Sequence, residues 1–188
     1  VMFEGTKTWF SFLYFVTAML PAYLLFALQL NLGNSRLINY WLVLIIGSVG
    51  GRIGYFMKDK LMQRRQEGQE IADEKLNIKD KNGDVITFLF GVVIPSLLLP
   101  DGASWIEQCI VTIFIQLGCY VLVKNSSDVI PNVLLIFLGV NIYASDDGRY
   151  LITINKSLHT KKFKGNICRL GDSFANNVFI LLSEDNKE

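Results

Sequence analysis

The sequence predicts an α-helical polytopic membrane protein with four transmembrane helices, cytoplasmic N and C termini, and a small C-terminal cytoplasmic β module. The first observation behind this prediction is composition, because 51% of the 188 residues are hydrophobic and only 19% are charged. Soluble domains carry roughly 25% charged residues. The second observation is distribution, because long apolar runs alternate with connections of very different charge.

Four apolar segments give the predicted helices. They are residues 9–30, 37–57, 85–99 and 105–123. A run of about 20 apolar residues is long enough to cross the hydrocarbon core of a bilayer, so the third segment is short for a span. The first segment contains Pro21, which is expected to kink its helix because proline lacks a backbone N–H and clashes with the preceding turn.

The charges of the connections predict the orientation. The connection 58–84 carries seven lysine or arginine residues, whereas the connection 31–36 carries one and the connection 100–104 carries none. Basic residues favour the cytoplasmic side of a membrane. The sequence therefore predicts a transmembrane domain over residues 1–127 and a cytoplasmic, mainly β module over residues 128–188.

Arg52 is the one charge inside the second apolar segment. It lies six residues before Lys58, so its guanidinium can reach the cytoplasmic headgroups and anchor the helix. The alternative interpretation is functional, with Arg52 pairing with lipid phosphate or with a neighbouring subunit.

Four glycines lie on one face of the same predicted helix. They are Gly47, Gly50, Gly51 and Gly54. Their spacing forms two overlapping G-x-x-x-G patterns, which allow helix backbones to approach closely. The expected role is helix packing or oligomerisation, and the partner is either another helix of this chain or a second copy.

The connection 58–84 is rich in helix-forming residues of both charges. It is expected to extend the second helix beyond the bilayer, with Gly68 as a weak point and a turn at residues 82–84. Such a charged stalk is either a solvated spacer or a docking surface for a cytosolic protein or anionic lipid.

The region beyond residue 128 predicts a different kind of structure. Residues 131–139 predict a short helix at the membrane surface. Residues 140–144 and 150–154 predict a β-hairpin across the turn 146–148. Further strands are predicted over residues 166–170 and 178–182. Because this module is small, it is expected to lean on the stalk, the membrane or a neighbouring subunit.

No residue pattern predicts catalysis, a cofactor or a metal site. Ser104 and Glu107 match the S-x-x-E capping box of a helix start, which explains the carboxylate in the fourth segment. His159 is the single histidine and has no ligand partner at a typical spacing. The basic run 159–164 is interpreted as a solvated loop or as a contact for phosphate. Without a catalytic motif the sequence predicts no enzyme, and its net charge of +1 does not indicate direct binding to nucleic acid.

Several features together resemble a known family. They are the four predicted spans with the basic connection 58–84, the P-N-x-L-L-x-x-x-G element at residues 131–139, the terminal β module, and the N-terminal stretch FEGTKTWFSFLYF. Together they are similar to the KwaA family, the membrane component of the Kiwa bacterial anti-phage system. The resemblance implies a tetrameric homo-oligomer of the bacterial inner membrane that senses phage infection. It also implies that the cytoplasmic face holds KwaB, a DNA-binding effector that impedes phage DNA replication.

The functional prediction is an oligomeric sensor or scaffold that recruits a cytosolic effector to the membrane. The residues expected to dock the partner are Arg64, Arg65, Lys75, Lys161, Lys162 and Lys164. The alternative is a channel or pore-forming effector subunit, in which Arg52 and Gln116 face a lumen. An enzyme acting on lipid is a third class, and it needs a cytoplasmic catalytic cluster that the sequence does not indicate.

Overall fold

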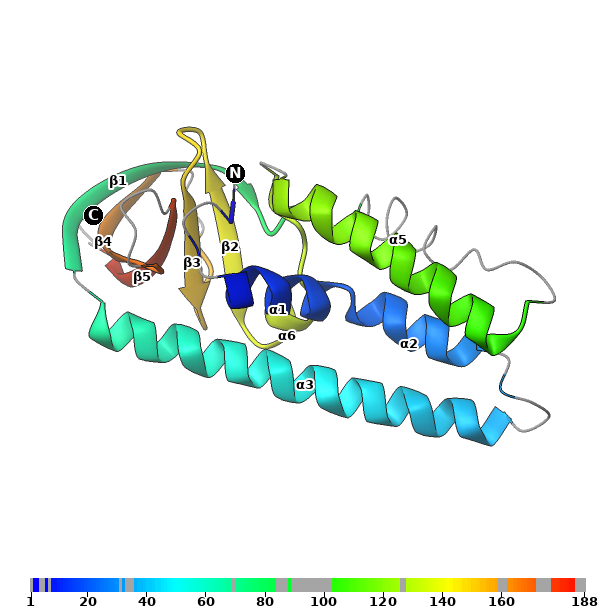
Figure 1. Ribbon diagram of the computed structural model, residues 1–188. Coiled ribbons are helices and arrows are strands. Elements are labelled where there is room, and N and C mark those ends of the chain that lie inside the picture. The colour runs from blue at the N-terminus through cyan, green and yellow to red at the C-terminus, as the bar shows by residue number, and fades with distance from the viewer. Residues whose placement is uncertain are drawn as a thin grey trace.

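Helices extend from one end of a β-barrel in the computed structural model of the chain (Figure 1). The structure describes residues 2–3, 6, 8–30, 32, 36–68, 70–83, 88, 103–125, 128–158, 162–171 and 177–184. The helices are α1 (Thr8–Ala18), α2 (Leu20–Gln29), α3 (Arg36–Glu67), α5 (Trp105–Asn125) and α6 (Val133–Phe137). The strands are β1 (Glu70–Lys81), β2 (Val140–Ser145), β3 (Tyr150–Ile154), β4 (Lys162–Arg169) and β5 (Val178–Glu184).

The first apolar segment forms two helices, α1 and α2, that are bent by 49° relative to each other. Pro21 lies in the first turn of α2, and Met19 separates the two helices. The proline ring has no N–H to donate to the carbonyl four residues earlier, so the helical ladder is interrupted just before it. The predicted kink is confirmed.

α3 is the longest helix, with 32 residues, and it runs alongside α2, α1 and the base of the barrel (Figure 1). Its start is tied to the end of α2 by Asn39, whose side-chain amide donates to the carbonyls of Leu28 at 3.2 Å and Leu30 at 2.7 Å. At its other end, the helix leads through Gly68 towards β1. α3 therefore connects the helices to the barrel without a long loop.

The five strands close into a barrel in the order β1-β2-β3-β5-β4. β3 and β5 are parallel, and every other neighbouring pair is antiparallel. This is the strand order of the OB fold, a small Greek-key barrel. The predicted hairpin is confirmed, because β2 pairs with β3 from Val140 opposite Ile154 to Ala144 opposite Tyr150. Gly148 supplies the turn with φ of +79°.

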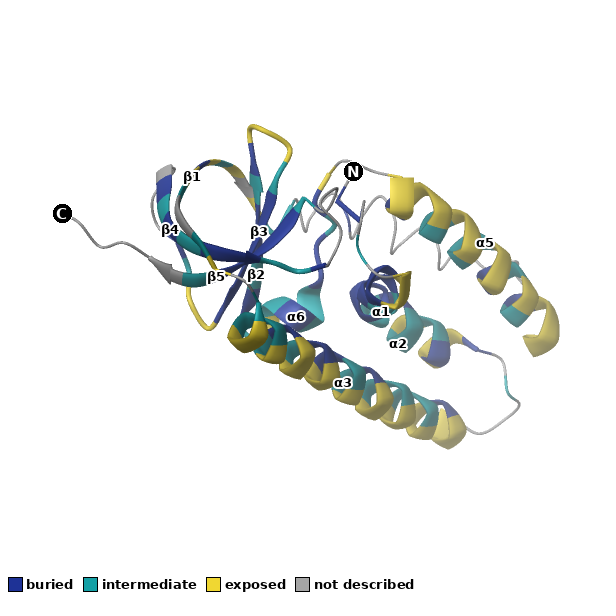
Figure 2. Ribbon diagram, turned by 60° about the vertical axis from the view of Figure 1, so that its left-hand side comes forward, coloured by how far each residue is buried: buried dark blue, intermediate teal, exposed yellow. Residues whose placement is uncertain are grey.

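Alternate residues of each strand face opposite sides, so the barrel contributes to two apolar layers. The interior of the barrel is filled by Leu76, Tyr143, Leu151, Leu158, Phe163, Ile167, Phe179 and Leu181. A second layer joins the outer face of β2, β3 and β5 to the helices, with Ile152 and Ile180 in the same cluster as Met57 and Leu61 of α3. Figure 2 shows these buried strands beside the exposed outer faces of α3 and α5.

The predicted fold class, a four-helix polytopic membrane protein with a small β module, is wrong. Among the described residues, two helices, α3 and α5, are long and apolar enough to cross a membrane, or up to three if α1 and α2 together form one span. The other main element is the closed barrel rather than a minor appendage. The third predicted segment, residues 85–99, lies outside the described residues except for Phe88.

The predicted helical stalk over residues 58–84 is also wrong in its second half. The helix ends at Glu67, and residues 70–81 form β1, which pairs with β2 and β4. Helix-forming residues dominate this stretch, but pairing on both edges overrides their weak local preference. β1 therefore lies before the predicted boundary between residues 127 and 128, and the other four strands of the barrel lie after it.

Candidate functional site

Two neighbouring strands, β1 and β4, carry three lysines whose side chains the structure describes. We term them the lysine face: Lys75, Lys79 and Lys164. The side chain of Lys162, also predicted to dock a partner, lies outside the described part of the structure. In the antiparallel register, Lys75 lies opposite Lys164, and Asn77 lies opposite Lys162. Leu76, which lies between Lys75 and Asn77 on β1, is buried inside the barrel. The alternation of β1 thus separates an apolar inner side from a charged outer side.

The lysine face places two lysines on neighbouring strands opposite each other. Like charges directly opposite each other, as at Lys75 and Lys164, destabilise an antiparallel pair. Two acidic residues of β1 have other partners, since Glu74 pairs with Arg149 and Glu70 accepts a hydrogen bond from β4. Exposed basic side chains such as those of Lys75 and Lys79 are suited to an acidic partner, because charge complementarity gives specificity and a fast encounter.

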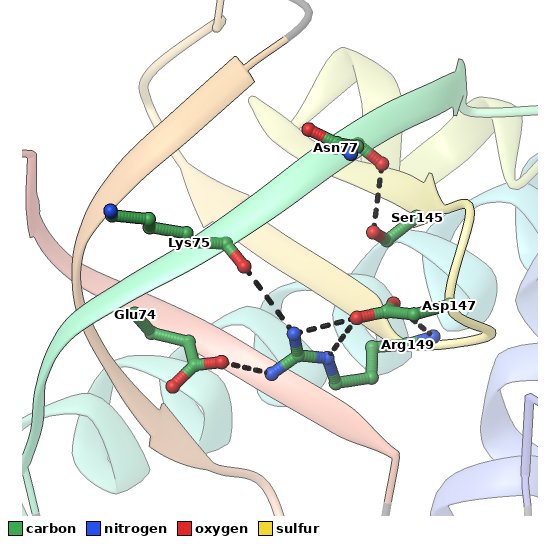
Figure 3. Close-up of polar contacts among 6 residues, drawn as sticks. All are labelled: Glu74, Lys75, Asn77, Ser145, Asp147 and Arg149. Atoms are coloured by element: carbon green, nitrogen blue, oxygen red, sulfur yellow. Dashed lines mark hydrogen bonds and ion pairs between the residues drawn. The ribbon is translucent and has the colours of Figure 1, made fainter.

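Arg149 holds β1 against the β2–β3 hairpin. Its guanidinium pairs with Glu74 of β1 and with Asp147 of the hairpin turn, with 2.6 Å from Nη2 to Oδ2 of Asp147 (Figure 3). It also donates to the carbonyl of Lys75 at 3.3 Å, while the ammonium of Lys75 points away from it (Figure 3). Burial alone would raise the pKa of Asp147, but hydrogen bonds from Arg149 and Ser145 outweigh it and lower that pKa. This network fixes the backbone that carries the lysine face.

Arg64 and Arg65, predicted to dock a partner, lie at the end of α3 against the barrel. The Nε of Arg64 donates to the carbonyl of Arg169 at 3.3 Å, and Nη2 of Arg65 donates to the carbonyl of Leu182 at 2.7 Å. Both side chains are half-buried. They bind α3 to β4 and to β5. Lys161 and His159 lie outside the described residues.

A buried polar cluster joins α1 to α6. Asn132 caps α6 by accepting from the Leu135 N–H at 3.1 Å. Its amide donates to the carbonyl of Tyr14 at 3.0 Å and to the hydroxyl of Thr17 at 2.7 Å. The Tyr14 hydroxyl donates to the carbonyl of Ile130 at 2.6 Å. The sequence analysis missed this role of Asn132, although an asparagine before an apolar run is a typical helix N-cap.

Lys58 makes a second link between the helices and the barrel. Its ammonium donates to the carbonyl of Leu138 at 2.7 Å and to Oδ1 of Asn155 at 3.0 Å. Leu138 ends α6, and Asn155 follows β3 with φ of +55°. Together with the arginine contacts and the Asn132 cluster, Lys58 makes the junction between helices and barrel a continuous set of polar contacts.

The family model described as "Anti-phage protein KwaA" matches residues 10–180 of the chain. The chain belongs to the KwaA family. The resemblance noted from the sequence is confirmed, and anti-phage defence is the process in which the chain takes part. No curated protein and no solved structure matches the chain.

In this KwaA family member, three of the four glycines of α3 face other parts of the same chain. A Cβ on Gly50 would lie 2.5 Å from Leu20 of α2, and a Cβ on Gly54 would lie 2.7 Å from Leu134 of α6. Gly47 is next to α2, at an ordinary contact distance. A Cβ on Gly51 would meet nothing within 4 Å. The glycines thus allow α2 and α6 to approach α3, and the surface at Gly51 stays open.

Arg52 and Gln116, the polar residues of the channel alternative, occupy different surroundings. Arg52 is exposed in a shallow hollow on the outer side of α3, beside Trp41 and Ser48. Gln116 of α5 faces α2, where its Oε1 accepts from the Tyr23 hydroxyl at 3.4 Å. The fold of a single chain therefore does not bring these two side chains together.

The barrel surface that binds ligands in many OB folds is covered in this chain. OB folds commonly bind oligonucleotides on the outer face of their second and third strands. Here that face belongs to the apolar layer shared with the helices, in which Ile142 and Ile152 cluster with Phe10 and Leu135. The exposed side chains of Lys75 and Lys79, in the lysine face, lie outside this apolar layer. Within the described part of the chain, no three metal-ligating side chains lie together.

Proposed function

We propose that the chain is a multi-pass protein of the bacterial inner membrane that acts as an oligomeric sensor and scaffold in anti-phage defence. In this role it recruits a cytosolic effector, which resembles KwaB, to the membrane through the lysine face. It catalyses no reaction itself and needs no cofactor, and the effector supplies the contact with DNA. The observation that carries the proposal is the contrast between exposed apolar helices and a lysine-bearing barrel.

Membrane insertion is supported by where apolar side chains remain exposed. The exposed large hydrophobic side chains of the described residues lie on helices and on none of the five strands. In the most apolar 18-residue stretch of α3, and in that of α5, only 17% of the residues are buried. Contiguous apolar surface of this extent is typical of contact with lipid or with another subunit.

Assembly is supported by the outer side of α3. Arg52 and Ser48 lie there among exposed apolar residues, and Gly51 leaves room for a close approach. An arginine within a bilayer is costly unless it is paired or reaches the headgroups. A second copy that covers this side of α3 reduces that cost, and four copies make the tetramer that the family resemblance implies.

Recruitment is supported by the rigid attachment of the lysine face. β1 carries Lys75 and Lys79 and begins three residues after α3 ends. The contacts of Arg64, Arg65 and Lys58 fix the barrel to the helices. A displacement of α3 by an event in the membrane is therefore passed to the surface that holds the effector.

The test is a pull-down of the tagged full chain from its native host in mild detergent, followed by native mass spectrometry. We expect a defined oligomer that carries a stoichiometric soluble protein with an acidic surface. The double variant Lys75→Glu and Lys164→Glu should lose that protein and keep the oligomer. The matched control is Lys156→Glu, an exposed lysine in the β3–β4 connection, which should retain the partner.

Two results contradict the proposal. Partner binding that survives reversal of both lysines would exclude the lysine face as the docking surface. A bare oligomer in the wild type would remove recruitment altogether, and ion flux through liposomes that contain the chain would then favour the channel alternative.

A further inference from the structure

A cleft of about 210 Å³ lies where α1, the end of α3 and the β4–β5 connection meet. Its apolar lining is formed by Phe10, Met57 and Leu61, which are 4%, 0% and 1% exposed. Leu170 and Gly171, just after β4, form the wall on the barrel side. The cleft is separate from the lysine face and from the hollow at Arg52.

The charged lining of the cleft comes from consecutive turns of α3. Lys60, Arg64 and Glu67 line it in that order, moving away from the apolar part of the helix. Residues three or four apart lie on the same helix face. The cleft therefore presents two cations followed by one carboxylate along a single line. Gln63, which accepts from the ammonium of Lys60 at 3.0 Å, lies beside them.

The position of the cleft matches the edge of the apolar surface. The last exposed large hydrophobic residue of α3 is Phe56, and Met57 begins the cleft. Trp9, 41% exposed, lines the cleft and packs edge-on against the Phe56 ring at 6.3 Å between centroids. The Lys60 ammonium lies 5.8 Å from the same ring. Tryptophan and lysine in such positions are typical of the boundary between hydrocarbon and headgroups.

From this geometry we infer that the cleft binds the headgroup of an aminophospholipid, with the phosphate at Lys60 and the terminal ammonium at Glu67. Arg64, whose Nε donates to the Arg169 carbonyl, adds positive charge between them. The acyl chains then follow the exposed apolar side of Trp9 and Phe56. In such a lipid the phosphate is nearer the acyl chains than the ammonium, which is the order of charges along α3. The inference rests on the proposed insertion in a membrane.

The test uses the full chain in mild detergent, titrated with phosphatidylethanolamine, phosphatidylcholine or phosphatidylglycerol, with bound lipid counted by native mass spectrometry. Phosphatidylethanolamine should bind about tenfold more tightly than the other two, the effect of one charge-assisted hydrogen bond. The methylated ammonium of phosphatidylcholine cannot donate to Glu67, and phosphatidylglycerol has no ammonium. Soluble glycerophosphoethanolamine distinguishes a site for the headgroup alone, since we expect it to compete only weakly.

Two variants assign the charges. Glu67→Gln should remove the preference for phosphatidylethanolamine over phosphatidylcholine and leave the binding of phosphatidylglycerol intact. Lys60→Gln should weaken the binding of all three lipids, and Lys60→Arg should restore it. Arg36→Gln is the matched control, because Arg36 is exposed at the opposite end of the same helix. It should bind like the wild type.

The inference is overturned if the wild type binds the three lipids equally or if Glu67→Gln keeps the preference. Glycerophosphoethanolamine that competes as well as the lipid also overturns it, because the acyl chains would then play no part. Carbonate extraction of membranes separates these results from failure of the proposed function. A chain that stays in the membrane pellet but shows no lipid preference removes the cleft assignment alone, whereas a chain that is released removes both.

Discussion

The barrel and the helices of this KwaA family member differ in how far their apolar side chains are buried. The barrel encloses Tyr143, Phe163 and Phe179 in its interior and uses its remaining apolar face to pack on helices. α3 and α5 leave Trp41, Phe114 and other large apolar side chains in contact with the surroundings. The barrel thus buries its apolar side chains, whereas α3 and α5 leave many of theirs exposed. The junction joins two parts of the chain with opposite distributions of apolar surface.

The largest expected effect is aggregation through the helices when detergent is removed. Removal of detergent from the purified full chain should cause aggregation, because the exposed side chains of α3 and α5 lose their cover. Light scattering during dilution into detergent-free buffer measures this. The same dilution into lipid nanodiscs is the control and should keep the chain dispersed. A monodisperse chain in buffer would mean that the helices are not membrane spans.

Asn132 offers the next largest effect, at the junction. Asn132→Ala should lower the free energy of unfolding by about 3 kcal/mol, because it removes the α6 cap and two buried hydrogen bonds to α1. Thermal unfolding followed by circular dichroism in detergent measures the loss. Asn125→Ala, at the exposed end of α5, is the matched control and should change stability little. Equal stability of the two variants would show that the cluster does not join the regions.

Gly68 tests the connection between α3 and β1. A Cβ at this position would lie 2.8 Å from the carbonyl oxygen of Arg64 and 2.8 Å from Cβ of Cys168. Gly68→Ala should therefore cost about 2 kcal/mol, since the overpacking forces the backbone to move. Gly51→Ala provides the contrast in the exposed part of α3, where nothing lies within 4 Å. It should be neutral or stabilising by up to about 1 kcal/mol. A reversed order of the two variants would contradict the described junction.

The smallest expected effect is a pH dependence of the barrel. The lowered pKa of Asp147 means that its pairing with Arg149 stabilises the fold above the ordinary aspartate range. The stabilisation is lost as the pH falls through the lowered pKa and the carboxyl becomes protonated. Both side chains are partly exposed, so the contribution is below about 1 kcal/mol. Unfolding curves from pH 7 to pH 3 should show a shallower decline for Arg149→Met than for the wild type. A parallel decline would exclude the pair as the cause.

Local patterns predicted local structure well. The hairpin of β2 and β3 depends on a short turn and on residues close in sequence, so the residue pattern of its two strands was enough to predict it. The capping box is likewise confirmed, because Glu107 accepts from the Ser104 N–H at 2.8 Å. β1 was missed because its partners are far away in sequence, with Leu76 opposite Phe163 and Lys81 opposite Tyr143.

The candidate site was predictable only in part. Lys75 and Lys164 were both expected to dock a partner, but their position opposite each other follows from strand register and not from composition. Arg64 and Arg65 donate to backbone carbonyls of the barrel, and a carbonyl acceptor leaves no pattern in the sequence. Two basic residues at a helix end therefore give the same sequence pattern whether they bind a partner or bind carbonyls of the same chain.

The place of β1 in the strand order has a consequence for how the protein is made. β1 is synthesised before α5 and α6, whereas its two neighbours, β2 and β4, follow those helices. During translation, β1 leaves the ribosome before any strand with which it pairs, and it stays unpaired while α5 is synthesised. The barrel can close only after α5, α6 and the four later strands have been synthesised. A chain whose helices are misplaced keeps β1 unpaired and accessible to chaperones and proteases.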